Sequence, residues 1–196
     1  MLIDDIKELY HITAIANVAA IVKGGIFSHN IVQKDKIKAV RIDEQGVQDR
    51  REKKIPGTEK MLHDYANLYF DAHNPMLSKR RNLNDSICVL RIEKTVFSVN
   101  GVIITDKNAS RDCWFKTIKE GLPLLSKIEV LAPYWNDLDL IVRKRLAGIK
   151  CAEVLIPEAV SPKYIVGAFV ANTTAKAEFE KVSSLPVEIN TDIFFY

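Results

Sequence analysis

Four short runs of aliphatic and β-branched residues set the strongest limit on what this chain can fold into. They cover residues 87–92, 102–105, 151–156 and 164–170, and proline or polar residues follow each run within two positions. Apolar runs of this length, bounded in this way, are typical of strands. Segments with helical spacing lie before and between them. The pattern therefore predicts an α+β domain with a central mixed or antiparallel sheet and flanking helices.

Size and composition are those of one soluble domain. The chain has 196 residues, with no internal repeat or linker, so residues 1–196 are predicted to form a single domain. Hydrophobic residues make up 47% and charged residues 27%, as in globular proteins. No apolar run reaches the roughly 18 residues that span a bilayer, so we expect no membrane partner. With no secretion signal and three scattered cysteines, the chain is expected in the cytoplasm.

The first half of the chain carries one clear helical signal. Thr13 is predicted to cap a helix that stops at the glycine pair 24–25. Its apolar face would consist of Ile15, Val18, Ala19 and Val22. Residues 29–60 are polar and weakly periodic, which favours a functional loop over a packed element. The aromatic-rich residues 63–70 are compatible with a strand.

In the second half, Asn100 and Gly101 predict a hairpin turn between the strands at 87–92 and 102–105. Residues 111–120 and 134–146 are predicted as helices. In the second of these, the core-facing residues would be Leu138, Ile141, Val142 and Leu146. The tail residues 186–189 are predicted as an edge strand.

One carboxylate, Glu153, lies near the start of the strand predicted at 151–156. Alternation sends Ala152, Val154 and Ile156 to one face and Glu153 to the other. On composition alone, a glutamate in such a strand is more often a solvated surface residue. Polar segments far upstream favour a different interpretation, in which Glu153 belongs to a shared site.

Those upstream segments contain His11, Thr13, Arg50 and Arg51. A neutral imidazole and a hydroxyl can bond a sugar or an amide, although a histidine beside a strand end is more often a core residue. One arginine of the pair, turned inward, could bind a diphosphate bidentately. The residues alone do not say which arginine that is.

Two tyrosines, Tyr65 and Tyr69, share one face whether their segment is a strand or a helix. They could contact a ligand or fill the core. The four histidines show no ligand spacing for a metal, so no metal cofactor is expected. The net charge of +3 is mild, but basic clusters brought together on one side would form a groove for a phosphate backbone.

The order of these segments resembles the DarT family of toxin DNA ADP-ribosyltransferases, distant relatives of the diphtheria-toxin and poly(ADP-ribose) polymerase folds. The resemblance runs from about residue 8 to about residue 170. Its motifs are residues 10–13 (YHIT) with Asn17, 25–28 (GIFS), 47–51 (VQDRR), 62–70 (LHDYANLYF), 74–77 (NPML), 105–109 (TDKNA) and 152–157 (AEVLIP). Each motif is weak alone, but together, in this order, they make a specific signal.

The resemblance implies a single ADP-ribosyltransferase-like domain whose central sheet is split into two halves. It also implies an enzyme that transfers ADP-ribose from NAD+ onto a base of single-stranded DNA, sequence-specifically, with thymine N3 the expected acceptor. The setting it implies is a toxin–antitoxin system, in which a macrodomain ADP-ribosylglycohydrolase removes the modification.

The resemblance also implies roles for individual residues. Arg51 and Glu153 would be catalytic. NAD+ would be held by His11, Thr13, Asn17, Tyr65, Tyr69 and again Arg51. The basic clusters of the sequence, rather than the resemblance, suggest the expected DNA contacts: Lys34, Arg41, Arg50, Lys53, Lys54, Arg143 and Arg145.

This chemistry suits those groups. Breaking the bond between nicotinamide and ribose builds positive charge on the sugar, which a carboxylate gripping a ribose hydroxyl stabilises. Thymine N3 lies on the base-pairing edge, so the acceptor must be single-stranded or extruded. Base preference could reside in residues 133–150 or in residues 29–60. A guanine-specific DNA transferase, a protein or RNA transferase, and a non-enzymatic nucleic-acid binding module remain the alternatives.

Overall fold

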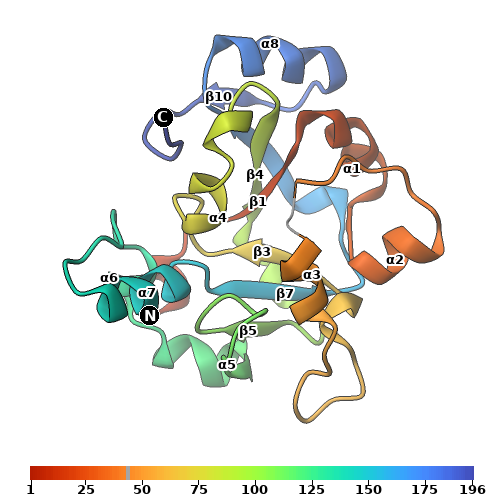
Figure 1. The fold of residues 1–196 in the computed structure, drawn as a ribbon. Helices are drawn as coiled ribbons and strands as arrows, with labels where there is room; N and C mark the ends of the chain where they lie inside the picture. Colours follow the sequence, from red (N-terminus) through yellow and green to blue (C-terminus); the bar gives the residue numbers. More distant parts are fainter. Residues whose placement is uncertain (43–44) are drawn as a thin grey trace.

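The computed structural model describes residues 1–42 and 45–196, which include an eight-stranded sheet (Figure 1). The strands are β1 (Glu8–Ala14), β2 (Ile26–Phe27), β3 (Tyr65–Tyr69), β4 (Ile87–Glu93), β5 (Ile103–Thr105), β6 (Phe115–Thr117), β7 (Glu153–Pro157), β8 (Ala159–Val160), β9 (Ile165–Val170) and β10 (Val187–Ile189). The large sheet has the order β10-β9-β4-β1-β3-β7-β5-β6, while β2 and β8 form a separate two-stranded sheet. Neighbours are antiparallel apart from β9 and β10, which confirms the predicted α+β class.

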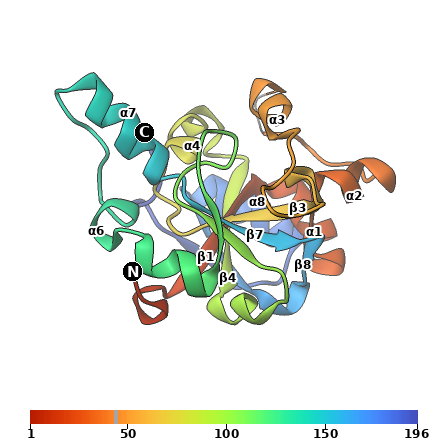
Figure 2. The same cartoon turned by 90° about the horizontal axis from the view of Figure 1, so that it is seen from below.

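Short helices flank the sheet. They are α1 (Val18–Gly24), α2 (His29–Lys34), α3 (Gln45–Arg51), α4 (Pro75–Ser78), α5 (Ile118–Gly121), α6 (Lys127–Val130), α7 (Leu140–Ile149) and α8 (Thr173–Val182). Helices α1 and α8 pack against one face of the sheet through residues such as Val18 and Phe179. Figure 2 shows α3, α4 and α7 on one side of the sheet, where their ends approach the same cavity.

The large sheet is split in the middle. Strand β1 pairs with β4 along its whole length, from Glu8↔Glu93 to Ala14↔Ile87. It pairs with β3 at Tyr10↔Tyr69. In Figure 1, β1 and β4 run steeply while β3 and β7 run across the view. The two halves therefore diverge beyond Tyr10, which confirms the split sheet that the resemblance implied.

Alternation along β7 divides its side chains between two clusters. Ala152, Val154 and Ile156 belong to the main core, whereas Leu155 packs in a separate cluster on the opposite face. Glu153 shares that opposite face, as the sequence predicted, but its exposure is 0%. The interpretation of Glu153 as a solvated surface residue is therefore wrong.

The first helix is present, but its start and its buried face differ from the prediction. Thr13 lies inside β1, and residues 15–17 form a 3₁₀ turn before α1 begins at Val18. Val18 and Ile21 are buried, while Ala19 and Val22 are exposed. The extra 3₁₀ turn rotates the helix face, which a uniform helical period cannot anticipate. The predicted end is confirmed, since Gly25 follows α1 with a φ of 104°.

The predicted hairpin at Asn100 and Gly101 is wrong. Gly101 does turn the chain, with a φ of 81°, but residues 94–98 form a 3₁₀ helix that separates the two strands. Strand β4 then pairs with β1 and β9, while β5 pairs with β6 and β7 in the other half. The sequence predicts the turn itself, but it does not show which strands β4 and β5 pair with.

The two helices predicted in the second half are also corrected. Residues 111–120 contain strand β6 and only the start of α5. Helix α7 begins at Leu140, because the Asp139 carboxylate accepts hydrogen bonds from the N–H groups of residues 141 and 142. Leu138 and Ile141, predicted to face the core, are 106% and 79% exposed. Helical spacing shows which side chains share a face, but it does not show whether another element of the fold packs against that face.

Two further expectations are met, and one is corrected. The tail forms β10 at the edge of the sheet, and residues 63–70 contain β3. Residues 29–60 contain α2 and α3 rather than one irregular loop, and positions 43–44 lie outside the described residues. No helix in the described part of the chain is long and apolar enough to cross a membrane.

Candidate active site

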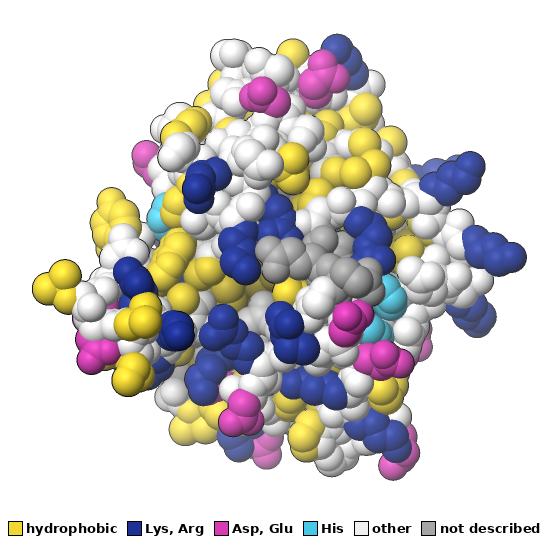
Figure 3. Space-filling model, in the orientation of Figure 1, with side chains coloured by type: hydrophobic (Ala, Val, Ile, Leu, Met, Phe, Trp, Pro, Cys, Tyr) yellow, Lys and Arg dark blue, Asp and Glu magenta, His cyan; other side chains and the backbone are white. Residues whose placement is uncertain are grey.

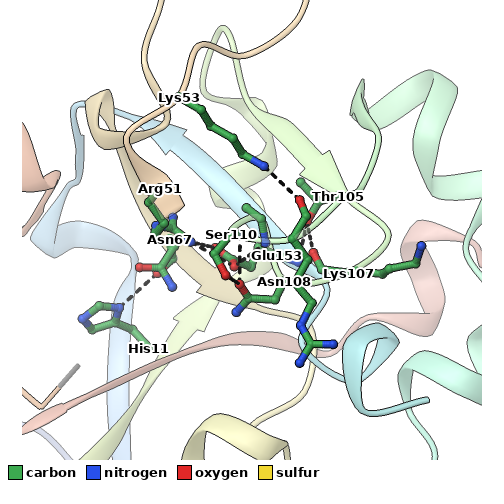
Figure 4. A network of polar contacts seen from close by, with 11 residues as sticks. His11, Arg51, Lys53, Asn67, Thr105, Lys107, Asn108, Ser110 and Glu153 are labelled. Atoms are coloured by element: carbon green, nitrogen blue, oxygen red, sulfur yellow. Dashed lines mark hydrogen bonds and ion pairs between the residues drawn. The ribbon is translucent and has the colours of Figure 1, made fainter. Parts of the chain in front are cut away.

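The site begins where β1 and β3 separate. His11 Nδ1 lies 3.0 Å from the carbonyl oxygen of Asn67 (Figure 4). A carbonyl can only accept, so Nδ1 carries the hydrogen and Nε2 is left as an acceptor. Burial lowers the pKa of His11, and the bond to Asn67 only partly opposes that shift. His11 is therefore a neutral imidazole at pH 7, with a fixed tautomer.

Glu153 lies on β7, on the other half of the sheet. Its carboxylate accepts hydrogen bonds from Arg51 Nη1, at 2.9 Å to Oε2 and 3.1 Å to Oε1. A third bond comes from the N–H of Ala109, 2.9 Å from Oε1. A buried carboxylate is stable only when it is paired and hydrogen-bonded, and Glu153 meets both conditions. Its own N–H donates to Thr105 Oγ1 at 3.0 Å, which fixes the backbone as well.

The structure distinguishes the two adjacent arginines at the end of α3. Arg51 is 7% exposed and points at Glu153, whereas Arg50 is exposed. The choice of Arg51 as the inward-facing arginine agrees with this geometry. Helix α3 thus brings an arginine from the first half of the chain to a carboxylate 102 positions later.

A cavity of about 360 Å³ lies against this pair. His11, Thr13, Asn67 and Tyr69 line it, as does Arg51. A smaller cavity of about 140 Å³ adjoins it and shares His11 and Thr13. Glu153, with 0% exposure, lies behind Arg51 rather than on the cavity wall. Access to its carboxylate therefore requires a shift of the Arg51 side chain.

Asn17 has a structural task next to this cavity. Its amide donates to the Val40 carbonyl at 2.9 Å and accepts from the Val40 N–H at 2.8 Å. The same amide nitrogen lies 3.2 Å from Thr13 Oγ1. Asn17 lines the smaller cavity and ties the segment after α2 to the end of β1. Its predicted contact with NAD+ stays a prediction.

The two tyrosines share a strand face but have different surroundings. Tyr69 lies opposite Glu153 in the β3–β7 register and lines the larger cavity. Burial, and then the negative charge of Glu153, raise the pKa of Tyr69 well above its usual value. Tyr65 packs instead with Ile55 and Leu62 and lines neither cavity. Four residues along a strand amount to about 13 Å, enough to place Tyr65 outside the site.

The predicted DNA contacts are also divided. Arg41 and Arg50 line the larger cavity. The others are not among its lining residues: Lys34, Lys53, Lys54, Arg143 and Arg145. Several of these have other contacts, since Lys53 donates to the Arg111 carbonyl at 2.9 Å, Lys54 bonds Glu59, and Arg145 bonds Glu129.

The predicted site residues leave out three basic residues on the cavity wall, Lys79, Arg80 and Arg111, although Lys79 and Arg80 belong to one of the basic clusters in the sequence. Lys79 and Arg80 follow α4, which begins inside the motif at 74–77, so that motif could have placed them near the site. Arg111 was hidden by the incorrect helix prediction for residues 111–120. Figure 3 shows lysine and arginine side chains gathered across the middle of the face that the cavity opens onto.

Comparisons with known proteins identify the family. A family model described as "ssDNA thymidine ADP-ribosyltransferase, DarT" matches residues 10–195. A DNA ADP-ribosyl transferase–DNA ADP-ribosyl glycohydrolase fusion protein of Thermosipho africanus is 28% identical over 202 residues, which cover 96% of this chain and 50% of the fusion. The chain thus spans about half the length of the curated relative it matches.

Solved structures share the fold. Thermosipho africanus DarTG in complex with ADP-ribose matches with a TM-score of 0.81 and 24% identity, over 96% of this chain and 51% of that one. Thermus sp. 2.9 DarT in complex with ADP-ribosylated ssDNA matches with a TM-score of 0.78 and 23% identity, over 97% of both chains. The same DarT in complex with NAD+ has a TM-score of 0.73 and 22% identity, over 97% of this chain and 98% of that one. Since the family model matches residues 10–195, nearly the whole sequence, this chain belongs to the DarT family.

Proposed function

We propose that this chain transfers ADP-ribose from NAD+ onto thymine, at N3, in single-stranded DNA. The observation that carries the proposal is the buried Arg51–Glu153 pair, held against a cavity with a basic wall. The family description names thymidine in ssDNA, and the similar Thermus DarT structures contain NAD+ or ADP-ribosylated ssDNA.

The residues of the cavity suit NAD+. Its volume of about 360 Å³, extended by the adjoining 140 Å³, is within the range of small-molecule sites. Guanidinium groups on its wall, such as Arg50 and Arg80, match the geometry of a diphosphate. His11 Nε2 can accept from a ribose hydroxyl or an amide, because Nδ1 already donates to Asn67. Thr13 offers a hydroxyl beside it.

Glu153 would stabilise the positive charge that develops when NAD+ gives up its ADP-ribosyl group. Oε1 accepts from the Ala109 backbone N–H and from Arg51, whereas the bond at Oε2 comes from Arg51, whose long side chain has several rotatable bonds. A ribose hydroxyl can therefore replace Arg51 at Oε2 while Ala109 keeps the carboxylate in place. Glu153 acts as an electrostatic grip in this scheme and does not need to take a proton.

Arg51, once displaced, lies on the cavity wall where the base must enter. A guanidinium is a poor base, so Arg51 is suited to polarise a thymine carbonyl; the N3 proton passes to solvent as N3 bonds the ribose carbon and nicotinamide leaves. Thymine N3 is hidden in a duplex, which requires a single-stranded acceptor. The basic side chains around the cavity supply the charge that a single strand needs.

We also propose the biological setting. The Thermosipho africanus relative joins a DNA ADP-ribosyl transferase to a DNA ADP-ribosyl glycohydrolase in one chain. An enzyme that blocks base pairing would harm its own cell unless the modification were removed. The chain is therefore proposed to act as a toxin in the cytoplasm, opposed by a macrodomain glycohydrolase antitoxin.

The test is mass spectrometry of a mixed-sequence oligonucleotide after incubation with NAD+. We expect ADP-ribose on thymine in the single strand and none on the same sequence in a duplex. Glu153→Ala should abolish the product, and Glu158→Ala, an exposed glutamate after the same strand, should not. Label on guanine would refute the proposed base, and an unlabelled oligonucleotide would refute the proposed activity.

A further inference from the structure

The loop between β5 and β6 contains a tight turn that the proposed function has not used. The N–H of Arg111 donates to the Asn108 carbonyl at 2.9 Å, which closes the turn. Inside it, the Asn108 side-chain oxygen Oδ1 accepts from the Ser110 N–H at 2.9 Å and from the Ser110 hydroxyl at 2.6 Å (Figure 4). Asparagine at the first position of a turn often bonds in this way to the residue two places later.

This arrangement occupies the N–H groups of Ser110 and Arg111 and leaves that of Ala109 for an outside partner. That N–H is 2.9 Å from Glu153 Oε1. Both Ala109 and Glu153 are 0% exposed, so no water can replace the bond if the turn rotates. The direction of one peptide group therefore decides how the Glu153 carboxylate is held.

Other contacts hold the ends of the turn but not that peptide. The Asn108 N–H donates to the Gly148 carbonyl in α7 at 3.2 Å. Lys53 Nζ donates to the Arg111 carbonyl at 2.9 Å. Both bonds fix where the turn sits between α7 and the segment after α3. The two bonds to Asn108 Oδ1 fix its interior, where the Ala109 N–H lies.

We propose that Asn108 is a positioning residue for Glu153, acting through the Ala109 N–H and not through the substrate. The inference rests on the proposed function and deepens it. Without the Oδ1 acceptor, the turn loosens, Oε1 loses its backbone donor, and the carboxylate rotates away from the ribose. The loss falls on turnover and spares NAD+ binding, because the cavity wall keeps its cationic residues.

The substitution Asn108→Asp separates this role from a direct contact, because Asn108 also lines the cavity. Aspartate keeps an oxygen that accepts both Ser110 bonds but lacks the amide N–H₂ that a substrate could use. Asn108→Ala removes both. The measurement is kcat and KM for NAD+ with a thymine-containing single strand, on the full chain, with thermal unfolding as a check on folding.

We expect Asn108→Ala to lower kcat about tenfold or more with KM nearly unchanged, as for loss of a hydrogen bond to a charged group. Asn108→Asp should stay within about threefold of the wild type, since it retains the acceptor. Should the alanine variant not fold, Asn108→Gln replaces it. Glutamine keeps the amide but displaces the oxygen, so kcat should again fall.

Equal losses in Asn108→Ala and Asn108→Asp, or a raised KM with an unchanged kcat, would overturn the inference and assign the amide a direct substrate contact. Wild-type turnover in Asn108→Ala, or in Asn108→Gln where that variant replaces it, would also overturn the inference. A wild-type chain without any transfer activity would overturn the proposed function and this inference together. An active wild type with unaffected variants would overturn the inference alone.

Discussion

At the scale of single residues, the Glu153 carboxylate has little freedom. It is fully buried and is held by Arg51 on one side and by a backbone N–H on the other. The backbone donor, the Ala109 N–H, cannot follow a shorter side chain, because it belongs to a closed turn. Side-chain length at position 153 therefore matters as much as charge.

Shortening that side chain by one methylene should abolish most of the activity. We expect Glu153→Asp to lower kcat for ADP-ribose transfer about 100-fold, close to the effect of Glu153→Gln, because the carboxylate no longer reaches the ribose hydroxyl. The measurement is steady-state transfer to an oligonucleotide at saturating NAD+. Glu158→Asp, exposed after the same strand, is the matched control. Near-normal activity in Glu153→Asp would show that length is not decisive.

Removing Arg51 should cost stability as well as activity. Arg51→Ala leaves a buried carboxylate without its cation, so the free energy of unfolding should fall by about 3 kcal/mol. Arg50→Ala, an exposed neighbour, should change it by less than about 0.5 kcal/mol. Urea denaturation measures both.

A double variant tests the cause of that loss. In the Arg51→Ala background, Glu153→Gln removes the uncompensated charge and should restore part of the lost stability. If the two substitutions destabilise additively, the side chains are not coupled and the loss has another origin.

At the scale of elements, the end of α7 is anchored through a buried lysine. Lys150 follows α7, and its side chain is 0% exposed. Its Nζ pairs with Asp71, in the turn before α4, and donates to the Ala132 carbonyl at 2.6 Å. The lysine thus fixes the segment that leads into β7 and Glu153, while the start of α7 projects its apolar residues into solvent.

Replacing that lysine by an apolar residue of similar length should remove both of its contacts and destabilise the fold. Lys150→Met leaves Asp71 without its cation, and we expect a loss of about 3 kcal/mol in the free energy of unfolding. Lys144→Met, exposed on the same helix, should leave it within about 0.5 kcal/mol. Thermal and urea unfolding check this, and similar effects of the two variants would contradict the anchoring role.

Helix α2 contacts the 3₁₀ helix Leu62–Asp64 through a stacked pair of histidines, His29 and His63, with ring centroids 4.3 Å apart. Burial, followed by the charges of His29 and Arg51, lowers the pKa of His63, while Glu52 and a bond to the Gln48 backbone partly oppose this. As the pH falls through 6.5, the ordinary pKa of histidine, the unfolded chain therefore binds a proton at position 63 more readily than the folded chain does. Acid should weaken the fold.

The free energy of unfolding should fall between pH 7.5 and pH 5.5, and His63→Asn should reduce that fall. Part of it should remain, because burial also lowers the pKa of His11. Urea titrations of both proteins at the two pH values provide the test. An unchanged pH dependence in His63→Asn would mean that this histidine does not titrate differently in the folded chain.

At the scale of the whole molecule, the site forms where two halves of a sheet separate. His11 comes from the β1 half, and Tyr69 and Glu153 come from the β3–β7 half. Basic residues reach the same cavity from α3, from the chain after α4 and from the loop before β6. A strand of DNA crossing this face would meet positive charge from several elements at once.

Salt dependence should reveal which basic residues meet phosphates. In the Glu153→Gln background, each contact with a single strand adds about −0.7 to the slope of log affinity against log salt. Arg50→Gln and Arg111→Gln, on the cavity wall, should each make that slope less negative by about 0.7. Arg143→Gln, exposed on α7 outside the cavity, should not. An equal effect of Arg143→Gln would instead support the sequence-based prediction that α7 contacts DNA.

Much of the fold and of the site follows from local patterns in the sequence. Period-two alternation placed Glu153 on the face opposite Val154, because a strand leaves no other choice. Glycine marked the end of α1, since few other residues adopt a φ of 104°. The order of motifs identified the family and favoured Arg51 and Glu153 as the catalytic pair.

Only the tertiary structure decided which segments meet. Pairing of β5 with β7 rather than β4, burial of Glu153, and exposure of Leu138 all depend on partners distant in the sequence. The same is true of the bond between Lys53, an expected DNA contact, and the Arg111 carbonyl. The local sequence determines which interactions a side chain can make, while long-range packing determines which groups lie close enough to make them with.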